Sequence, residues 1–384
     1  MDLSKLDVDE ILRMATPRFK PFLAPTEEQR AVIQAPLKPL LVVAGAGAGK
    51  TTTMSQRVLY MVAHHGIDPE RILGLTFTRK AAGELGLKMR QDLATLASNS
   101  GQEFVGEPTA LTYNSFAARI LGEYGATIGV DPNSRLIGQA QQVQVLSAIV
   151  ENWRGEYPQS DEQYKPTATI VAAVLSLSGH IAEQNMTLDE GRIALSAFQK
   201  ELEEVAAISG KDPTGNLKKM IEANRNRLLL LDIAEAFESY KRAHGLIDFS
   251  DQLLLATQIV TSNKDVVSQV RSDYQAVLLD EFQDTSVIQM VFLSALLADH
   301  PTTAVGDPSQ AIYGWRGASA SALSDFLTRF SPCHDAAQLV LSTAWRNDQT
   351  ILDAANAIAQ PLRGQARIGD AGNAATRESK PQRI

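Results

Sequence analysis

The sequence has one cysteine, no long apolar run and no excess of positive charge. Because Cys333 is the only cysteine among 384 residues, an intrachain disulfide and a cysteine-based zinc or iron–sulfur site are excluded. No apolar run approaches the roughly 18 uncharged residues of a membrane helix, and the acidic start of the chain does not read as a signal peptide. We therefore expect a cytoplasmic protein without a membrane segment.

The overall charge gives little support to a polybasic mode of nucleic-acid binding. Lys and Arg total 36 against 44 Asp and Glu, a formal net charge of −8. A local basic groove remains compatible with this balance, so the motifs must decide. The composition, 44% hydrophobic and 21% charged, is that of a globular chain long enough for roughly two to three domains.

Strand, turn and helix patterns alternate in two separate parts of the chain. Apolar runs at 40–43 and 72–75 are followed by turn residues and helical stretches, and similar runs return at 276–279, 302–305 and 339–341. This alternation predicts a parallel α/β sheet. The chain between these parts shows apolar residues at helical spacing, which predicts an inserted helical domain.

These patterns divide the chain into five expected segments. We expect an N-terminal extension, a first α/β part, the helical insertion, a second α/β part and the start of a further domain: 1–24, 25–124, 125–244, 245–337 and 338–384.

A glycine- and alanine-rich turn joins the first predicted strand to a helix. Its sequence, Ala44-Gly45-Ala46-Gly47-Ala48-Gly49-Lys50-Thr51, fits a P-loop, although Ala44 stands where the strict pattern has Gly. Small residues let backbone N–H groups surround phosphates, Lys50 adds positive charge, and the Thr51 hydroxyl can bind Mg²⁺. A simple packing turn is the alternative, which the Lys-Thr pair disfavours. The expected nucleotide contacts are Ala46, Gly47, Ala48, Gly49, Lys50, Thr51 and Thr52.

Two later strands end in polar residues suited to phosphoryl transfer. Asp280 and Glu281 follow the run 277–279, where Asp280 can bind Mg²⁺ and Glu281 can deprotonate the attacking water. Gln310 follows the next strand and can sense the γ-phosphate. A solvated acidic turn and an exposed turn glutamine are the alternatives for these positions.

Seven segments in order resemble the superfamily 1 DNA helicases of the UvrD, Rep and PcrA type. The segments are Thr26 to Arg30, Ala44 to Thr51, Thr76 to Ala82, Asp248 to Asp251, Asp280 to Thr285, Val305 to Ala318, and Trp345 to Asn347.

The resemblance implies a RecA-like P-loop NTPase fold that uses ATP and Mg²⁺. It implies that Gln29 recognises adenine and that Trp345 stacks on the base. It also implies that Arg346 contacts the γ-phosphate, and the expected catalytic residues are Lys50, Glu281, Gln310 and Arg346. Amide, indole and guanidinium groups suit these roles. Without the family, Trp345 would be read as a core residue and Arg346 as a surface ion-pair partner.

The resemblance also implies a site for single-stranded DNA. Aromatic faces stack on bases without reading their sequence, and Phe77 is alternatively the continuation of a buried strand. Asn114 replaces the usual His of the family. The implied DNA contacts are Phe77, Thr78, Arg79, Asn114, Tyr313, Trp315 and Arg316.

The expected function is an ATP-dependent DNA helicase or translocase. The resemblance implies 3′-to-5′ movement, single- and double-stranded DNA as partners, a nucleoid-associated place and a role in repair or recombination. The chain looks most like the motor part of the AdnAB helicase-nuclease, which would add a second subunit. The later family motifs are not found, so we expect an N-terminal piece of a longer protein. A non-catalytic ATP- and DNA-binding module is the alternative.

Overall fold

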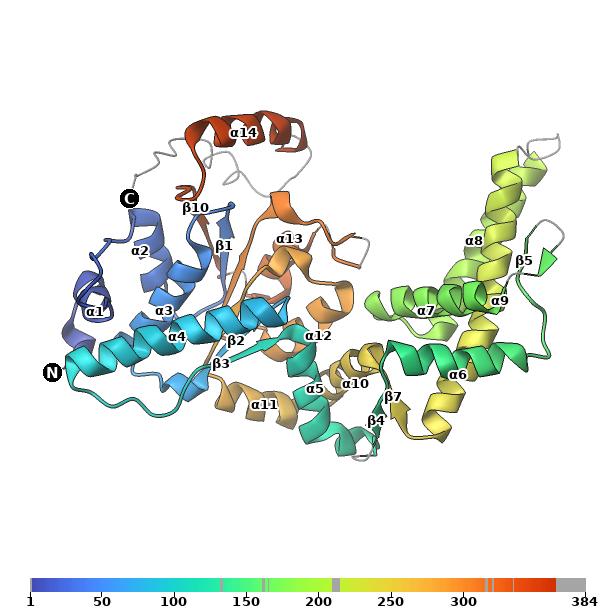
Figure 1. Ribbon diagram of the computed structural model, residues 1–384, viewed down its shortest axis with the longest axis horizontal. Coiled ribbons are helices and arrows are strands. Elements are labelled where there is room, and N and C mark those ends of the chain that lie inside the picture. Colours follow the sequence, from blue (N-terminus) through green and yellow to red (C-terminus); the bar gives the residue numbers. More distant parts are fainter. Residues whose placement is uncertain are drawn as a thin grey trace. The chain divides into compact units, whose positions relative to one another are not determined.

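The computed structural model describes residues 2–131, 134–160, 163–164, 166–208, 215–314, 317–319, 321–333 and 335–363. Contacts within the chain divide it into two compact units (Figure 1). Unit 1 comprises Met1–Phe116, Val260–Ser286 and Phe292–Ile384, and unit 2 comprises Ala117–Ile259 and Val287–Val291.

Unit 1 is built on a six-stranded parallel sheet with the order β10-β1-β9-β8-β2-β3. This is the RecA-like α/β fold that the sequence predicts. The strands are β1 Leu40–Ala44, β2 Ile72–Thr76, β3 Thr109–Thr112, β8 Ala276–Leu279, β9 Thr302–Gly306 and β10 Ala337–Leu341.

Burial along the strands follows their place in the sheet. Every residue of β2, β8 and β9 is buried, as is all of β1 except one residue. The edge strands β3 and β10 are mostly half-buried. Parallel strands covered on both faces need continuous apolar runs, which explains why the central strands have no polar alternation.

Strand β10 differs from the expected division of the chain. We expected residues from 338 onward to begin a further domain, but β10 pairs in register with β1, from Leu40 opposite Ala337 to Ala44 opposite Leu341. A five-residue apolar run is compatible with any sheet. Only the hydrogen bonds to β1, almost 300 residues earlier in the chain, assign it to this one.

Ten helices carry described residues of unit 1, three of them shared with unit 2. The helices of unit 1 alone are α1 Val8–Met14, α2 Glu27–Gln34, α3 Lys50–His65, α4 Arg79–Ser100, α11 Lys264–Asp273, α13 Ala322–Arg329 and α14 Gln349–Arg363. The shared helices are α5 Tyr113–Tyr124, α10 Phe249–Ser262 and α12 Val287–Leu297. Short 3₁₀ helices are η1 Leu3–Lys5, η2 Pro69–Arg71, η4 Phe282–Asp284 and η5 Pro308–Gln310.

The N-terminal segment is part of the core of unit 1. Val8, Ile11 and Leu12 of α1 are buried in the same hydrophobic cluster as Val32 and Ile33 of α2. Helix α1 also contacts α3 and α4. The apolar residues of α1 therefore pack in the core beside α3 and α4, the helices that follow β1 and β2.

Unit 2 is mainly helical. Helices α8 and α9 run side by side, and α9 also packs on α6 and α7 (Figure 1). A core that includes Leu146, Val174 and Phe237 joins these helices. Its elements are η3 Gly125–Ile128, α6 Gln139–Glu151, α7 Thr167–Glu183, α8 Leu188–Ile208, α9 Gly215–Ala243 and the short strands β4 Arg135–Leu136, β5 Gln159–Ser160, β6 Gln163–Tyr164 and β7 Leu246–Ile247.

Among the described residues, no helix combines the length and the apolarity that a membrane span would need.

Candidate nucleotide and DNA site

The predicted site residues of unit 1 follow strands of one parallel sheet. Ala44 ends β1, Thr76 ends β2, Leu279 ends β8, Gly306 ends β9 and Leu341 ends β10. Because all the strands run in the same direction, their carboxyl ends lie at one edge of the sheet, where α/β proteins bind ligands.

The P-loop turns into α3 through two glycines in the left-handed region. Gly47 has φ +76° and Gly49 has φ +82°, conformations that L side chains rarely adopt. Helix α3 begins at Lys50, and its N-cap Gly49 makes no side-chain capping bond. The first N–H groups of α3, with the helix dipole behind them, therefore form an anion-binding end. Thr51 and Thr52 lie exposed in this first turn.

Gln29 is held beside the P-loop by a capping box. Its backbone N–H donates to Thr26 Oγ1 at 3.2 Å, and its side-chain Oε1 accepts from the Thr26 backbone N–H at 3.1 Å. A Cβ added at Gly49 would lie 3.0 Å from Gln29 Nε2. The capping box therefore occupies the amide oxygen and leaves the NH₂ group on the side of the P-loop.

Trp345 and Arg346 dock on the same loop. The Trp345 backbone N–H donates to the Gly47 carbonyl at 2.9 Å. A Cβ at Gly47 would lie only 2.7 Å from Arg346 Cβ, so the close approach requires glycine. Both side chains are exposed, Trp345 to 39%. The structure thus brings Gln29, the P-loop, Trp345 and Arg346 together.

Lys50 and Glu281 connect the P-loop to the end of β8. Lys50 Nζ lies 3.2 Å from Glu281 Oε2, and the lysine side chain is 13% exposed. Glu281 has φ +49°, a left-handed conformation that is uncommon outside glycine and that clusters at functional sites. The turn therefore aims the carboxylate of Glu281 at the P-loop lysine.

Asp280, the residue before Glu281, is almost entirely buried, with 6% of its surface exposed. Burial, and next the neighbouring Glu281, raise the pKa of Asp280 to about 6, while Lys50 opposes the shift. The buried hydroxyl of Tyr113 donates to the Asp280 carbonyl at 2.9 Å and fixes the backbone here. A buried carboxylate with a raised pKa gains from a nearby positive charge.

The proposed metal ligands have suitable chemistry. A hydroxyl at Thr51 and a carboxylate at Asp280 are hard oxygen donors of the kind that Mg²⁺ prefers. The raised pKa of Asp280 is the observation that favours a cation beside it. The residues present therefore fit a magnesium ion carried in with phosphates.

A hydrogen-bonded chain runs from Glu281 to Gln310 through two residues that we did not single out from the sequence. Gln283 Nε2 donates to Glu281 Oε2 at 2.9 Å, and Gln283 Oε1 accepts from the Asp307 backbone N–H at 3.1 Å. Gln310 Nε2 then donates to Asp307 Oδ2 at 2.6 Å. Gln283 and Asp307 lie inside the matched segments, but nothing in the sequence pairs them.

The two middle residues of this hydrogen-bonded chain, Gln283 and Asp307, have little freedom to move. Gln283 is 2% exposed and Asp307 7% exposed. Gly306 has no room for a side chain, because a Cβ there would lie 2.7 Å from Gln283 Oε1. The two strand ends, of β8 and β9, are therefore mechanically connected at the level of single side chains.

The predicted DNA residues are only partly described. Phe77 and Tyr313 stack on each other with ring centroids 4.9 Å apart, and both are half-buried. Thr78 is exposed and caps α4 by accepting from the Ala81 N–H at 3.1 Å. Arg79 and Asn114 are exposed at the starts of α4 and α5. Trp315 and Arg316 lie outside the described residues.

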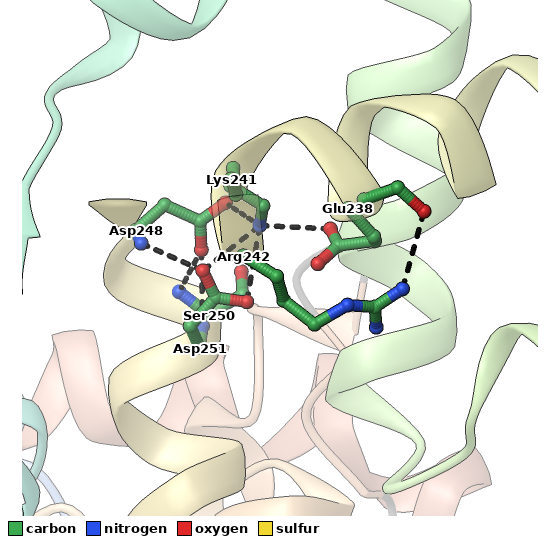
Figure 2. A network of polar contacts seen from close by, with 7 residues as sticks. Glu238, Lys241, Arg242, Asp248, Ser250 and Asp251 are labelled. Atoms are coloured by element: carbon green, nitrogen blue, oxygen red, sulfur yellow. Dashed lines mark hydrogen bonds and ion pairs between the residues drawn. The ribbon is translucent and has the colours of Figure 1, made fainter. Parts of the chain in front are cut away.

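The matched segment Asp248 to Asp251 belongs to unit 2 and forms a different cluster, shown in Figure 2. Lys241 Nζ lies 2.7 Å from Glu238, 2.8 Å from Asp248 and 2.8 Å from Asp251. The lysine side chain is 2% exposed.

The remaining bonds of this cluster organise the start of α10. Asp248 Oδ1 accepts from the N–H groups of Ser250 at 2.9 Å and Asp251 at 3.0 Å, and Asp251 Oδ2 accepts from the Asp248 N–H at 2.8 Å. Three carboxylates of this kind can hold a metal ion, but the ammonium of Lys241 already supplies the positive charge among them. The cluster is a structural junction between α9 and α10.

The comparisons with known proteins indicate one family over most of the chain. The family described as UvrD/REP helicase N-terminal domain matches residues 25–331. The chain is 28% identical over 332 residues to the ATP-dependent DNA helicase PcrA of Leuconostoc citreum, covering 86% of this chain and 38% of that protein.

Two further relatives give the same result. Identity is 29% over 346 residues to the ATP-dependent DNA helicase UvrD2 of Mycobacterium bovis, covering 88% of this chain and 44% of that protein. It is 25% over 340 residues to DNA helicase II of Escherichia coli, covering 88% and 41%. The chain spans about two fifths of the length of the curated relatives that it matches.

Proposed function

Because the chain belongs to the UvrD/REP helicase family, we propose that it forms the ATP-binding motor part of an ATP-driven DNA helicase. The observation that carries this proposal is the gathering of Gln29, Lys50, Glu281, Trp345 and Arg346 around one P-loop. These groups can meet a base, a triphosphate and an attacking water from different sides.

The proposed nucleotide contacts follow the donors at the site. The N–H groups of α3 and Lys50 bind the phosphates, Gln29 and Trp345 bind the adenine, and Arg346 approaches the γ-phosphate. When bound with ATP at Thr51 and Asp280, Mg²⁺ supplies positive charge that offsets the charge of the phosphates. A charge-assisted hydrogen bond to phosphate is roughly twice as strong as a neutral one, which favours Lys50 as the main anchor.

The proposed base is Glu281. Its carboxylate now contacts Lys50 at 3.2 Å. A phosphate that engages Lys50 frees the Glu281 carboxylate to accept a hydrogen bond from the attacking water. Glu281 is then placed to take the proton of that water when the substrate is bound.

The chain of bonds through Gln283, Asp307 and Gln310 supports a link between nucleotide and DNA. Gln310 stands three residues before Tyr313, whose ring stacks on Phe77. A change at Glu281 displaces Gln283, and Asp307 is tied to it. We propose that Phe77 and Tyr313, with Thr78, Arg79, Asn114, Trp315 and Arg316, hold single-stranded DNA and respond through this route.

Finer assignments stay proposals that rest on the sequence resemblance. We propose 3′-to-5′ movement, a role in DNA repair or recombination in the cytoplasm at the nucleoid, and an AdnAB-like subfamily with a second helicase-nuclease subunit. The subfamily proposal rests on Arg79 and Trp345, which stand where relatives more often carry Asn and Tyr. Co-purification of the protein from its native cells tests the second subunit.

ATP hydrolysis with and without single-stranded DNA tests the catalytic proposal. Turnover that DNA stimulates, and that Lys50→Ala and Glu281→Gln abolish, is expected. Lys200→Ala changes an exposed lysine on α8 and is the control that should retain activity. Binding of Mg-ATP without turnover would instead favour a non-catalytic module, and failure to bind ATP would overturn the site.

DNA binding is tested separately. Phe77→Leu and Tyr313→Leu should each weaken binding of single-stranded DNA by about 1 to 3 kcal/mol, or roughly 5- to 150-fold. Fluorescence anisotropy with a labelled oligonucleotide measures the affinity. Phe19→Leu, at an aromatic residue that is 83% exposed, is the control. Equal affinity of the Phe77 variant and this control would contradict the proposed DNA site.

A further inference from the structure

The Glu28 side chain accepts two hydrogen bonds from Ser342, which lies 314 residues later in the chain. The Ser342 backbone N–H donates to Glu28 Oε2 at 2.7 Å, and the Ser342 hydroxyl donates to Glu28 Oε1 at 2.6 Å. Both residues are half-buried. Both oxygens of one carboxylate are therefore committed to one serine, which is a strong and directional pairing.

The contact lies close in sequence to three of the predicted nucleotide-binding residues. Ser342 directly follows β10, and Trp345 and Arg346 come three and four residues later. Glu28 directly precedes Gln29 in the first turn of α2. Only Thr343 and Ala344 separate Ser342 from Trp345, and Ala344 is buried, so a shift of Ser342 should also displace Trp345.

Other roles of Glu28 do not account for the contact. The N-terminus of α2 is already capped by Thr26 and Gln29, which satisfy each other in a capping box. Glu27 lies on the same turn and supplies a second acidic residue near the positive end of the helix dipole. What distinguishes Glu28 from Glu27 is its pairing with Ser342.

The loop carrying Trp345 is then held at two points. One is the Glu28–Ser342 pair, and the other is the hydrogen bond from the Trp345 N–H to the Gly47 carbonyl at 2.9 Å. The second bond is weaker, because both of its partners are neutral. The two hydrogen bonds from Ser342 to the charged Glu28 carboxylate therefore contribute most to holding the loop in place.

We propose that Glu28 is a positioning residue that holds the loop with Trp345 and Arg346 against the P-loop. By doing so it sets the affinity for nucleotides that carry a γ-phosphate. The second statement rests on the proposed function, in which Trp345 and Arg346 contact ATP. The first statement concerns the position of Trp345 alone and can be tested without nucleotide.

The position of Trp345 can be read by its fluorescence. The chain has three tryptophans, and Trp153→Phe with Trp315→Phe leaves Trp345 as the single emitter. In this background Glu28→Ala should shift the emission to the red and increase quenching by acrylamide, because Trp345, now 39% exposed, gains contact with water. Glu27→Ala, on the same turn, should leave both unchanged.

Nucleotide binding then tests the consequence. Glu28→Ala should weaken Mg-ATP binding about tenfold, as expected for loss of a charge-assisted pair, and should weaken Mg-ADP binding less. Glu28→Gln should retain most of the affinity, because its amide can accept from the Ser342 N–H and donate to the Ser342 hydroxyl. Ser342→Ala removes one of the two bonds and should give a smaller change of the same sign, even where Glu28→Ala fails to fold.

The outcomes separate the two statements. If quenching of Trp345 in Glu28→Ala and Ser342→Ala equals that in Glu27→Ala, the positioning role is overturned. If quenching rises while Mg-ATP affinity stays the same, and Trp345→Ala also binds ATP normally, the positioning role stands and the proposed contact of Trp345 with nucleotide is overturned. Thermal unfolding of each variant verifies that the compared proteins are folded.

Discussion

Two lysines, each among carboxylates, differ in how completely those carboxylates neutralise them. Lys50 beside the P-loop has one ion pair with Glu281 at 3.2 Å and is 13% exposed. Lys241 in unit 2 has three carboxylates at 2.7 to 2.8 Å and is 2% exposed. An ammonium with a single partner can still bind a phosphate, whereas an ammonium enclosed by three carboxylates serves the stability of the fold.

The pKa values of the Lys241 cluster reflect its burial and its excess of carboxylates. Burial acting alone would lower the pKa of Lys241, but Asp251, Glu238 and Asp248 raise it above the usual value. Burial, and after it Asp251 and Asp248, raise the pKa of Glu238 to about 7 against the effect of Lys241. One lysine is thus not enough to keep three buried carboxylates fully ionised at neutral pH.

The largest expected effect is on the enclosed lysine. Lys241→Met should lower the free energy of unfolding by about 3 to 5 kcal/mol, because three carboxylates lose their positive partner. Urea denaturation measures the change. Adding Glu238→Gln and Asp251→Asn to Lys241→Met should restore part of the stability, since fewer unpaired charges remain. A stability equal to that of the unsubstituted protein would show that the cluster is dispensable.

The same substitution at Lys50 should act on binding instead. Lys50→Met is expected to weaken Mg-ATP binding about 10- to 150-fold, because a charged donor contributes about 1.5 to 3 kcal/mol. The unfolding temperature should change little, since the pair with Glu281 is partly exposed. Isothermal titration calorimetry and thermal unfolding of both lysine variants test the contrast. Loss of stability without loss of binding would reverse it.

The raised pKa of Glu238 predicts a dependence of stability on pH. The folded protein holds a proton on Glu238 up to about pH 7, whereas the ordinary pKa of this carboxyl is 4.5. The contribution of Glu238 to stability should therefore fall as the pH rises from about 4.5 to 7, by an amount of the order of 1 to 3 kcal/mol. Glu238→Gln should flatten this decline, as urea denaturation at several pH values would measure.

Two carboxyl groups of the nucleotide site should also lower the stability as the pH rises. They are present in both proteins and therefore provide an internal comparison. Asp280 and Asp284 also have pKa values raised to about 6, in both cases first by burial and then by Glu281. They remain in the Glu238→Gln variant, so the difference between the two proteins reports Glu238 together with the carboxylates that interact with it, Asp251 and Asp248. An unchanged slope in the variant would contradict the proton assignment.

The smallest effect is expected at a half-buried ion pair of similar length, between Arg30 and Asp9. Arg30 and Asp9 lie 2.8 Å apart with side chains 34% and 31% exposed. Asp9→Asn should reduce the free energy of unfolding by less than about 1 kcal/mol, because water already solvates both groups. A loss of stability as large as that of Lys241→Met would show that burial does not explain the difference between the Arg30–Asp9 pair and the Lys241 cluster.

The sequence predicted much of unit 1 because its signals are local. The P-loop needs Gly47 and Gly49 in positive φ and Lys50 at the start of a helix, and all three are set by neighbours in the chain. The apolar runs of the central strands predicted a buried parallel sheet for a similar reason. The carboxyl-end position of Asp280 followed directly from that sheet.

The helical unit was less informative at the level of side chains. Apolar spacing predicted helices between 125 and 244, but it assigned no role to Asp248 or Asp251. Their partner Lys241 lies on α9, seven residues before Asp248 and ten before Asp251, and only the turn through β7 brings them together. A lysine on a helix is usually solvated, so nothing in the local sequence marks Lys241 as buried.

What the sequence by itself determined is the set of chemical groups at the edge of the sheet and their order along the chain. Only the tertiary structure decided which groups meet. It placed β10 beside β1, tied Gln283 to Asp307, and joined Glu28 to Ser342 across 314 residues. The physical reason is that propensity and spacing act over a few residues, whereas these contacts depend on the pairing of distant strands and on the exclusion of water between them.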